Sequence, residues 1–117
     1  MKRNNKYTNS TYTYPLMNDE NSEITDKFLE VLSEIFFSYA KDDKLDIYNY
    51  KVYFKYAMNF NVTSAMENEA ISSFHKFDMG NKGYWTCNDF ILFHANACQE
   101  KKSAIYMNLL NLGYKVV

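Results

Sequence analysis

Apolar residues recur at intervals of three and four along most of this chain, with polar residues between them. After Ser22 the apolar positions form one wide stripe, made of Phe28, Leu32, Ile35, Phe36 and Tyr39. Residues at this spacing share one face of a helix. The pattern therefore predicts a first amphipathic helix that begins after Asn21 or Ser22 and ends before the charged run of residues 41–44.

Four further helices are predicted by the same spacing together with capping residues. Asp46 is a suitable N-cap for the second helix, and Ser64 and Glu67 have the spacing of a capping box for the third. The fifth helix spans residues 100–112 and ends at Gly113, which suits the left-handed conformation of a helix C-terminus. The apolar faces comprise Tyr50, Tyr53, Phe54 and Met58 in the second helix; Ala70, Ile71, Phe74 and Phe77 in the third; Phe90, Phe93 and Ala97 in the fourth; and Ala104, Ile105, Leu109 and Leu112 in the fifth.

The first 20 residues are polar, lack a period and contain Pro15, which interrupts a helix. We therefore predict an irregular N-terminal arm over residues 1–20 and a helical domain over residues 21–117. Two interpretations of the arm stay open, a tail that remains irregular and a segment that becomes ordered on a partner. The second makes its apolar residues the candidate partner contacts, namely Tyr12, Tyr14, Leu16 and Met17.

Composition supports one all-α domain and excludes several functions. The 117 residues are 47% hydrophobic, and only three glycines and one proline are available for tight turns. The net charge of −1 argues against nucleic-acid binding, and the chain has no apolar run of ~20 residues that would insert into a membrane. The chain shows no export signal, so its two cysteines, Cys87 and Cys98, indicate free thiols in a reducing compartment. We therefore expect a cytoplasmic protein.

Residues 74–90 contain the most specific motif of the chain. A twelve-residue loop runs from Asp78 to Asp89, with Gly83 at its sixth position and Trp85 at its eighth. The aromatic residues of the flanking helices are Phe74, Phe77 and Phe90, which we expect to be structural together with Gly83 and Trp85. This motif resembles the helix–loop–helix unit of the EF-hand (calmodulin-like) superfamily, whose loops bind calcium through oxygen ligands.

Judged by that resemblance, the loop lacks most of its calcium chemistry. Gly80 offers no ligand at the third position, Lys82 places a cation at the fifth, and Asp89 is shorter than the usual glutamate at the twelfth. If calcium binds at all, the resemblance implies the ligands Asp78, the carbonyl of Tyr84, Thr86 and Asp89. No metal and no cofactor is therefore expected, although a calcium site in this second loop remains the alternative.

An equivalent unit precedes it by about 40 residues, since Phe37, Leu45 and Tyr50 are spaced like Phe77, Trp85 and Phe90. The resemblance implies a pair of degenerate hands joined by a short β-bridge between Leu45 and Trp85. The register of the first loop stays open, because it begins either at Ser38 or two residues later. Two alternatives also stay open for the fifth helix, which fills the groove of the pair or anchors the chain on a neighbour.

Three other groups of residues are weaker candidates for sites. Acidic residues 42, 43 and 46 are expected to form a solvated loop, and His94 and Cys98 a packed stripe with no zinc ligation. Met58, Met66, Met79 and Met107 are typical either of core filling or of a methionine-lined groove for a partner helix.

Patterns typical of catalysis are absent, so we expect no enzyme. The resemblance implies a calcium-independent interaction or scaffold subunit that binds a protein partner within a larger assembly, such as one of the cytoskeleton or a cilium. The alternative is a calcium sensor or light-chain-like regulator that uses the second loop.

Overall fold

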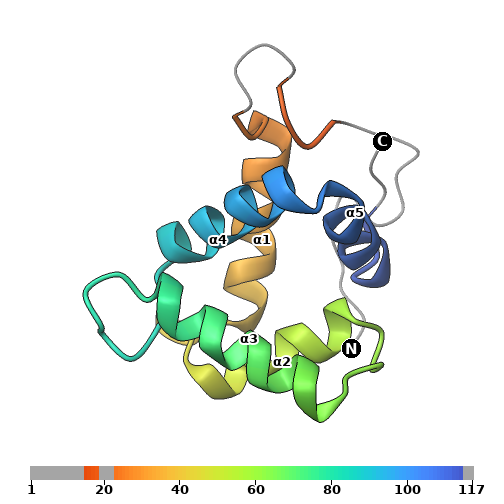
Figure 1. Cartoon of the computed structure of the whole chain (residues 1–117). Coiled ribbons are helices and arrows are strands. Elements are labelled where there is room, and N and C mark those ends of the chain that lie inside the picture. Colours follow the sequence, from red (N-terminus) through yellow and green to blue (C-terminus); the bar gives the residue numbers. More distant parts are fainter. Residues whose placement is uncertain (1–14, 19–22, 115–117) are drawn as a thin grey trace.

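The computed structural model describes residues 15–18 and 23–114. Its five helices are α1 (Asp26–Tyr39), α2 (Ile47–Ala57), α3 (Ser64–Phe77), α4 (Cys87–Glu100) and α5 (Lys102–Asn111) (Figure 1). Within these residues the β-structure is limited to isolated bridges, so the predicted all-α class is confirmed. None of the described helices is long and apolar enough to cross a bilayer.

Side-chain caps fix the starts of the first four helices, and two of these starts differ from the prediction. Helix α5, predicted from residue 100, begins at Lys102 without such a cap. Helix α1 begins at Asp26, later than expected, because Thr25 caps it while Ile24 is held extended by its bridge to Met17. The N-cap of α3 is Thr63 rather than Ser64, since the extended Thr63 accepts a hydrogen bond from the backbone of Met66. Asp46 caps α2 as predicted. Each cap satisfies a backbone N–H that the helix leaves unpaired.

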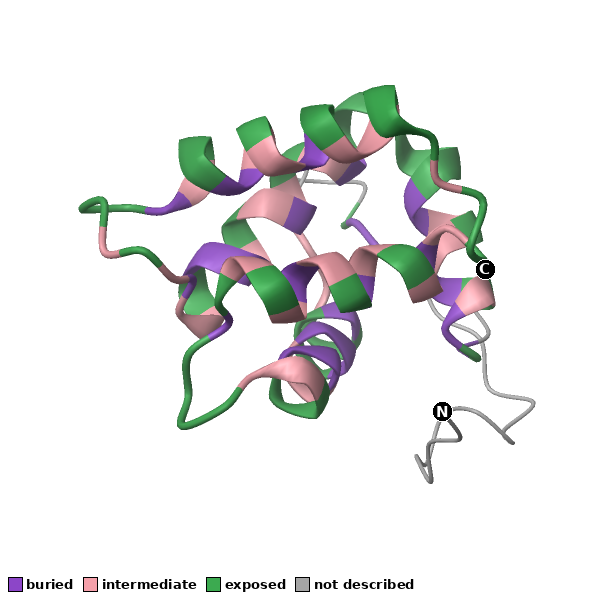
Figure 2. Ribbon diagram, turned by 90° about the horizontal axis from the view of Figure 1, so that it is seen from below, coloured by how far each residue is buried: buried purple, intermediate pink, exposed green. Residues whose placement is uncertain are grey.

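Helices α1 and α2 form one helix–loop–helix unit, and α3 and α4 form a second. The α1–α2 loop and the α3–α4 loop pair with each other. Leu45 and Trp85 exchange backbone hydrogen bonds of 2.9 and 2.8 Å, which confirms the predicted bridge. Helix α1 packs against α4, and α2 packs against α3. The buried residues of these four helices, coloured purple in Figure 2, belong to one core cluster. The core is therefore shared by the two units.

Helix α5 packs against both α2 and α4 and contributes Ile105, Leu109 and Leu112 to the core. It ends in a Schellman motif, in which Gly113 has a φ of 96° and the N–H of Tyr114 donates to the carbonyl of Leu109 at 2.8 Å. The predicted face is correct except for Ala104, which is exposed. Because the helix completes the core of its own chain, the structure supports the intramolecular alternative that the sequence left open.

The end of the predicted arm is also part of the core. Leu16 and Met17 are buried, and the N–H of Thr25 donates to the carbonyl of Leu16 at 3.0 Å. The interpretation of Leu16 and Met17 as partner contacts is corrected accordingly, because both side chains contact the helices of their own chain. Tyr12 and Tyr14 lie outside the described residues.

Candidate functional site

The loop of residues 78–86 joins α3 to α4 and projects from one side of the molecule, at the left of Figure 1. Asp78 is the C-cap of α3, and Asp89 lies in the first turn of α4. Both carboxylates are buried. The chain turns sharply between them because Gly80 and Gly83 have φ angles of 83° and 89°, which a residue with a Cβ adopts only under strain.

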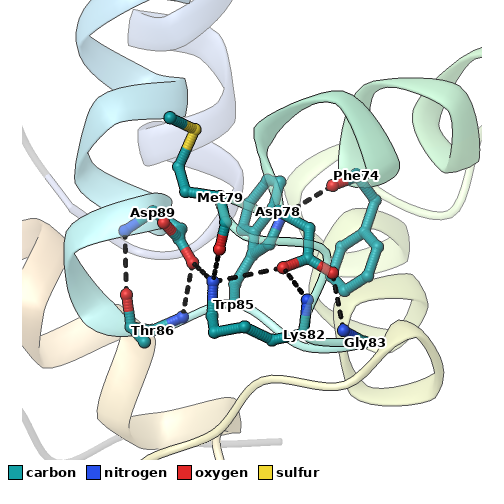
Figure 3. A network of polar contacts seen from close by, with 8 residues as sticks. All are labelled: Phe74, Asp78, Met79, Lys82, Gly83, Trp85, Thr86 and Asp89. Carbon is teal, nitrogen blue, oxygen red and sulfur yellow. Dashed lines mark hydrogen bonds and ion pairs between the residues drawn. The ribbon is translucent and has the colours of Figure 1, made fainter.

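The space between the two carboxylates holds the ammonium group of Lys82 (Figure 3). Its Nζ donates to Asp78 Oδ1 at 3.1 Å, to Asp89 Oδ2 at 2.9 Å and to the carbonyl oxygen of Met79. Two oxygens from the loop and one from the first turn of α4 thus surround one cation. The Lys82 side chain is only 25% exposed. The positive charge that the sequence placed at the fifth position of the loop is therefore directed into the loop.

Each carboxylate also binds backbone groups. Asp78 accepts the N–H of Lys82 at 2.9 Å and that of Gly83 at 2.7 Å. Asp89 accepts the N–H of Thr86 at 3.0 Å, while Thr86 Oγ1 accepts the N–H of Asp89, which makes a capping box for α4. Asp78 thus holds the turn together, and Asp89 links the ammonium group to the start of the next helix.

These contacts favour the ionised forms of Asp78 and Lys82. Burial raises the pKa of Asp78, but the backbone N–H groups of Lys82 and Gly83 and the Lys82 ammonium outweigh this, so its pKa lies below the ordinary value. The hydrogen bond to Asp89 is the main reason that the pKa of Lys82 is raised, against a smaller lowering by burial and with a further rise from Asp78. The ion pair is therefore present at neutral pH.

The donor set of this loop does not fit a divalent cation. Calcium requires six to eight oxygen ligands, whereas Asp78 and Asp89 already bind the ammonium group and Gly80 has no side chain. Thr86 Oγ1 caps α4 instead of facing an ion. Throughout the described ranges there is no group of three or more His, Cys, Asp or Glu side chains that could hold a metal ion.

Tyr84 connects this loop to the first loop through its ring. The ammonium groups of Lys44 and Lys82 lie 5.0 and 5.6 Å from the ring centroid. At these distances the ring attracts both cations. Among the candidate calcium ligands, the structure links Asp78 and Asp89 through the Lys82 ammonium group, and Asp89 and Thr86 through the capping box of α4. The Tyr84 ring contacts the two lysines instead.

Trp85 anchors the loop in the core. Its side chain is fully buried, and its Nε1–H donates to the carbonyl of Phe74 at 2.8 Å. Its ring stacks on Phe74 with centroids 5.0 Å apart and contacts Tyr50 at 4.9 Å and Phe93 at 5.3 Å. Trp85 is thus buried between the two units, and Phe74 and Phe90, which the sequence also suggested as structural residues, are buried with it.

The first loop is shorter than the second and forms a tight turn. Lys41 and Lys44 exchange backbone hydrogen bonds, and Asp42 and Asp43 between them both have positive φ angles, as two-residue hairpin turns require. Helix α1 continues to Tyr39, so the later of the two registers is the correct one. Asp46 caps α2, and the carboxylates of Asp42 and Asp43 are exposed, so these three acidic residues do not converge on a common metal site.

A groove lies where α2, α3 and α4 meet the start of α5. Two adjoining hollows of about 230 and 320 Å³ share Tyr50, Phe54 and Phe93 as their floor. Met58 and Met66 line one wall, whereas Met79 and Met107 are exposed elsewhere. Two of the four methionines that the sequence grouped together therefore contribute to this groove.

His94 belongs to a buried pair that sequence reasoning missed. Its Nδ1–H donates to the carbonyl of Phe90 at 2.8 Å, and its Nε2 accepts from the hydroxyl of Tyr53 at 2.5 Å. Burial lowers the pKa of His94 to about 4, against a smaller rise from the bond to Phe90. The imidazole is neutral at pH 7 and serves as a packing element between α2 and α4. No sequence signal linked two residues 41 positions apart.

Comparisons of the chain with protein-family models, curated proteins and solved structures gave no match. The geometry of the loop and the groove is therefore the basis for any functional assignment.

Proposed function

We propose that this chain is a non-enzymatic protein-interaction or scaffold subunit of a larger assembly, with a fold that needs no calcium. The observation that carries the proposal is the position of the Lys82 ammonium group between Asp78 and Asp89. In a calcium-binding loop an ion would neutralise the carboxylates at these two ends. Here a side chain of the loop itself does so.

This arrangement argues against a regulatory role for calcium. A ligand changes the conformation of a protein only if it binds one state better than another. To enter this loop, calcium would have to displace a protonated amine that is held by three oxygens, and would then find no side-chain ligand at residue 80. The calcium-sensor alternative requires an affinity that this donor set does not supply.

The groove supplies a surface for a partner segment. Tyr50, Phe54 and Phe93 together with Met58 and Met66 give it a largely apolar lining, to which Glu69 and Lys101 add one charge of each sign. Such surfaces bind the apolar face of an amphipathic helix, and flexible methionine side chains adapt to its shape. A cytoskeletal or ciliary assembly remains an analogy with the superfamily that the sequence resembles.

Isothermal titration calorimetry with calcium tests this proposal. We expect no heat of binding for the natural chain at sub-millimolar calcium. The variant Lys82→Asn removes the internal cation and provides an oxygen at the fifth position, so we expect it to gain measurable calcium affinity. Lys44→Asn is the matched control, because its ammonium group contacts the same Tyr84 ring but neither loop carboxylate, and it should bind no calcium.

Two results would decide against the proposal. Micromolar binding of calcium by the natural chain would favour the sensor. Equal binding by the Lys44 and Lys82 variants would show that the internal ammonium group is not what excludes the ion.

A further inference from the structure

Helix α2 turns a basic and aromatic face to the solvent. Tyr48, Val52 and Phe60 are 73%, 44% and 62% exposed, and with Tyr56 they follow one another at intervals of four residues. This spacing places Tyr48, Val52 and Tyr56 on one face of α2. Phe60 lies beyond the last residue of the helix and continues the stripe through its ring contact with Tyr56. Lys51 and Lys55 flank the stripe, and the helix contains no carboxylate, so its net charge is +2. These residues are called the α2 face below.

The end of the α2 face is held in an unfavourable backbone conformation. Phe60 has a φ of 64°, which is rare for a bulky residue and costs stability. Its N–H donates to the carbonyl of Lys55 at 2.8 Å, and its ring packs edge-on against Tyr56 at 4.9 Å while remaining exposed. Glycine would meet the same backbone requirement without strain. The phenylalanine instead extends the stripe by one aromatic ring.

Helix α1 turns an acidic face to the solvent. Leu29 and Phe37 are 39% and 55% exposed and lie on the same side of the helix as the exposed Asp26 and Glu30. The helix contains three carboxylates and one lysine, so its net charge is −2. This α1 face thus has apolar residues flanked by acids, where the α2 face has apolar residues flanked by lysines.

We propose that the α2 face binds the α1 face of a second copy of this chain. The two faces match in charge and in apolar content, whereas contact between two α2 faces would place lysines against lysines and contact between two α1 faces would place acids against acids. A contact between two different patches is heterologous and continues along a chain of copies unless it closes. Neither face includes the loop of Lys82, so this inference does not depend on the proposed function.

Charge-reversal variants test the contact by analytical ultracentrifugation. We expect the weight-average mass of the natural chain to rise above that of a monomer at concentrations on the order of 100 μM, since a pair of helix faces is a small interface. The double variants Lys51→Glu/Lys55→Glu and Asp26→Lys/Glu30→Lys should each remain monomeric. Their equimolar mixture should associate again, because each then offers a face complementary to the other.

Two further measurements make the test specific. The control Lys76→Glu/Lys102→Glu changes the net charge by the same amount as Lys51→Glu/Lys55→Glu but leaves both faces intact. It should therefore associate like the natural chain. Phe60→Gly relieves the backbone strain but removes the ring, so it should raise the melting temperature and weaken the association. Circular dichroism verifies that every variant is folded.

The proposal is wrong if the natural chain stays monomeric over this range, or if the mixture of charge-reversed variants fails to associate while both are folded. It is also wrong if Lys51→Glu/Lys55→Glu leaves self-association unchanged. Binding of the monomeric natural chain to anionic phosphatidylserine vesicles, lost in that variant, would assign the α2 face to a lipid surface instead.

Discussion

Trp85 joins both helix–loop–helix units through one side chain. It combines the backbone bridge to Leu45, the hydrogen bond to Phe74 and ring contacts with Tyr50 and Phe93. We expect Trp85→Ala to lower the free energy of unfolding by about 3–5 kcal/mol, as other buried large-to-small changes do. Trp85→Phe retains most of the packing and loses the Nε1 hydrogen bond, so about 1–3 kcal/mol should be lost. Urea denaturation measures both, and equal losses would contradict the role given to ring packing.

His94 makes the stability of the fold depend on pH. Its pKa falls from an ordinary value of 6.5 to about 4 on folding, so the unfolded chain takes up a proton that the folded chain excludes. Stability should therefore be full above pH 6.5 and decrease by about 1.4 kcal/mol per pH unit as the pH falls towards 4. The stabilisation from Asp78, whose pKa is lowered from 3.8, is lost only below this window.

The pH effect is measured as the urea midpoint between pH 7 and 4. The paired variant Tyr53→Phe/His94→Phe removes the buried imidazole without leaving the hydroxyl unsatisfied, and its midpoint should vary less with pH. The control His75→Gln alters an exposed histidine and should keep the natural profile. An unchanged slope in the paired variant would mean that other groups cause the pH dependence.

At the scale of elements, α5 offers two adjacent leucines with opposite environments. Leu109 is buried in the core and Leu110 is exposed. We expect Leu109→Ala to cost about 2–5 kcal/mol, because it leaves a cavity between α5 and its neighbours α2 and α4. Leu110→Ala should change stability by less than about 0.5 kcal/mol. Thermal unfolding checks both, and similar effects at the two positions would indicate that α5 is not docked as described.

The elements were predictable from sequence where a local pattern determined them. The stripe of α1 and the cap at Asp46 follow from spacing along the chain, whereas the bridge of Leu45 with Trp85 was implied by the resemblance to paired hands. Tertiary contacts were not predictable in this way. Burial of Leu16 depends on a surface made by distant helices, and the position of the Lys82 ammonium group depends on the rotamer of a long side chain. The positive charge of residue 82 was evident from the sequence, but the direction of its side chain was not.

For the whole molecule, the core extends beyond the helices to Leu16 and Met17. Leu16 is fully buried, and its carbonyl accepts the N–H of Thr25 at the start of α1. We expect Leu16→Ala to lower the melting temperature by on the order of 10 °C, from a loss of about 2–5 kcal/mol. Differential scanning calorimetry measures this in the full chain, with Leu110→Ala as the exposed control. A single transition near the natural temperature would show that this segment adds little to stability.

The Lys82 ammonium group is covalently attached to the loop whose carboxylates it neutralises, so it stays near them without being bound from the solvent. A bound metal ion exchanges with the solvent, so the state of its loop follows each pulse and decline of the ion's concentration. The ammonium group cannot diffuse away from Asp78 and Asp89, and neither dilution nor a chelator removes it. The cation of this loop is therefore supplied by the chain itself, at a level that does not depend on the concentration of any ion in the solvent.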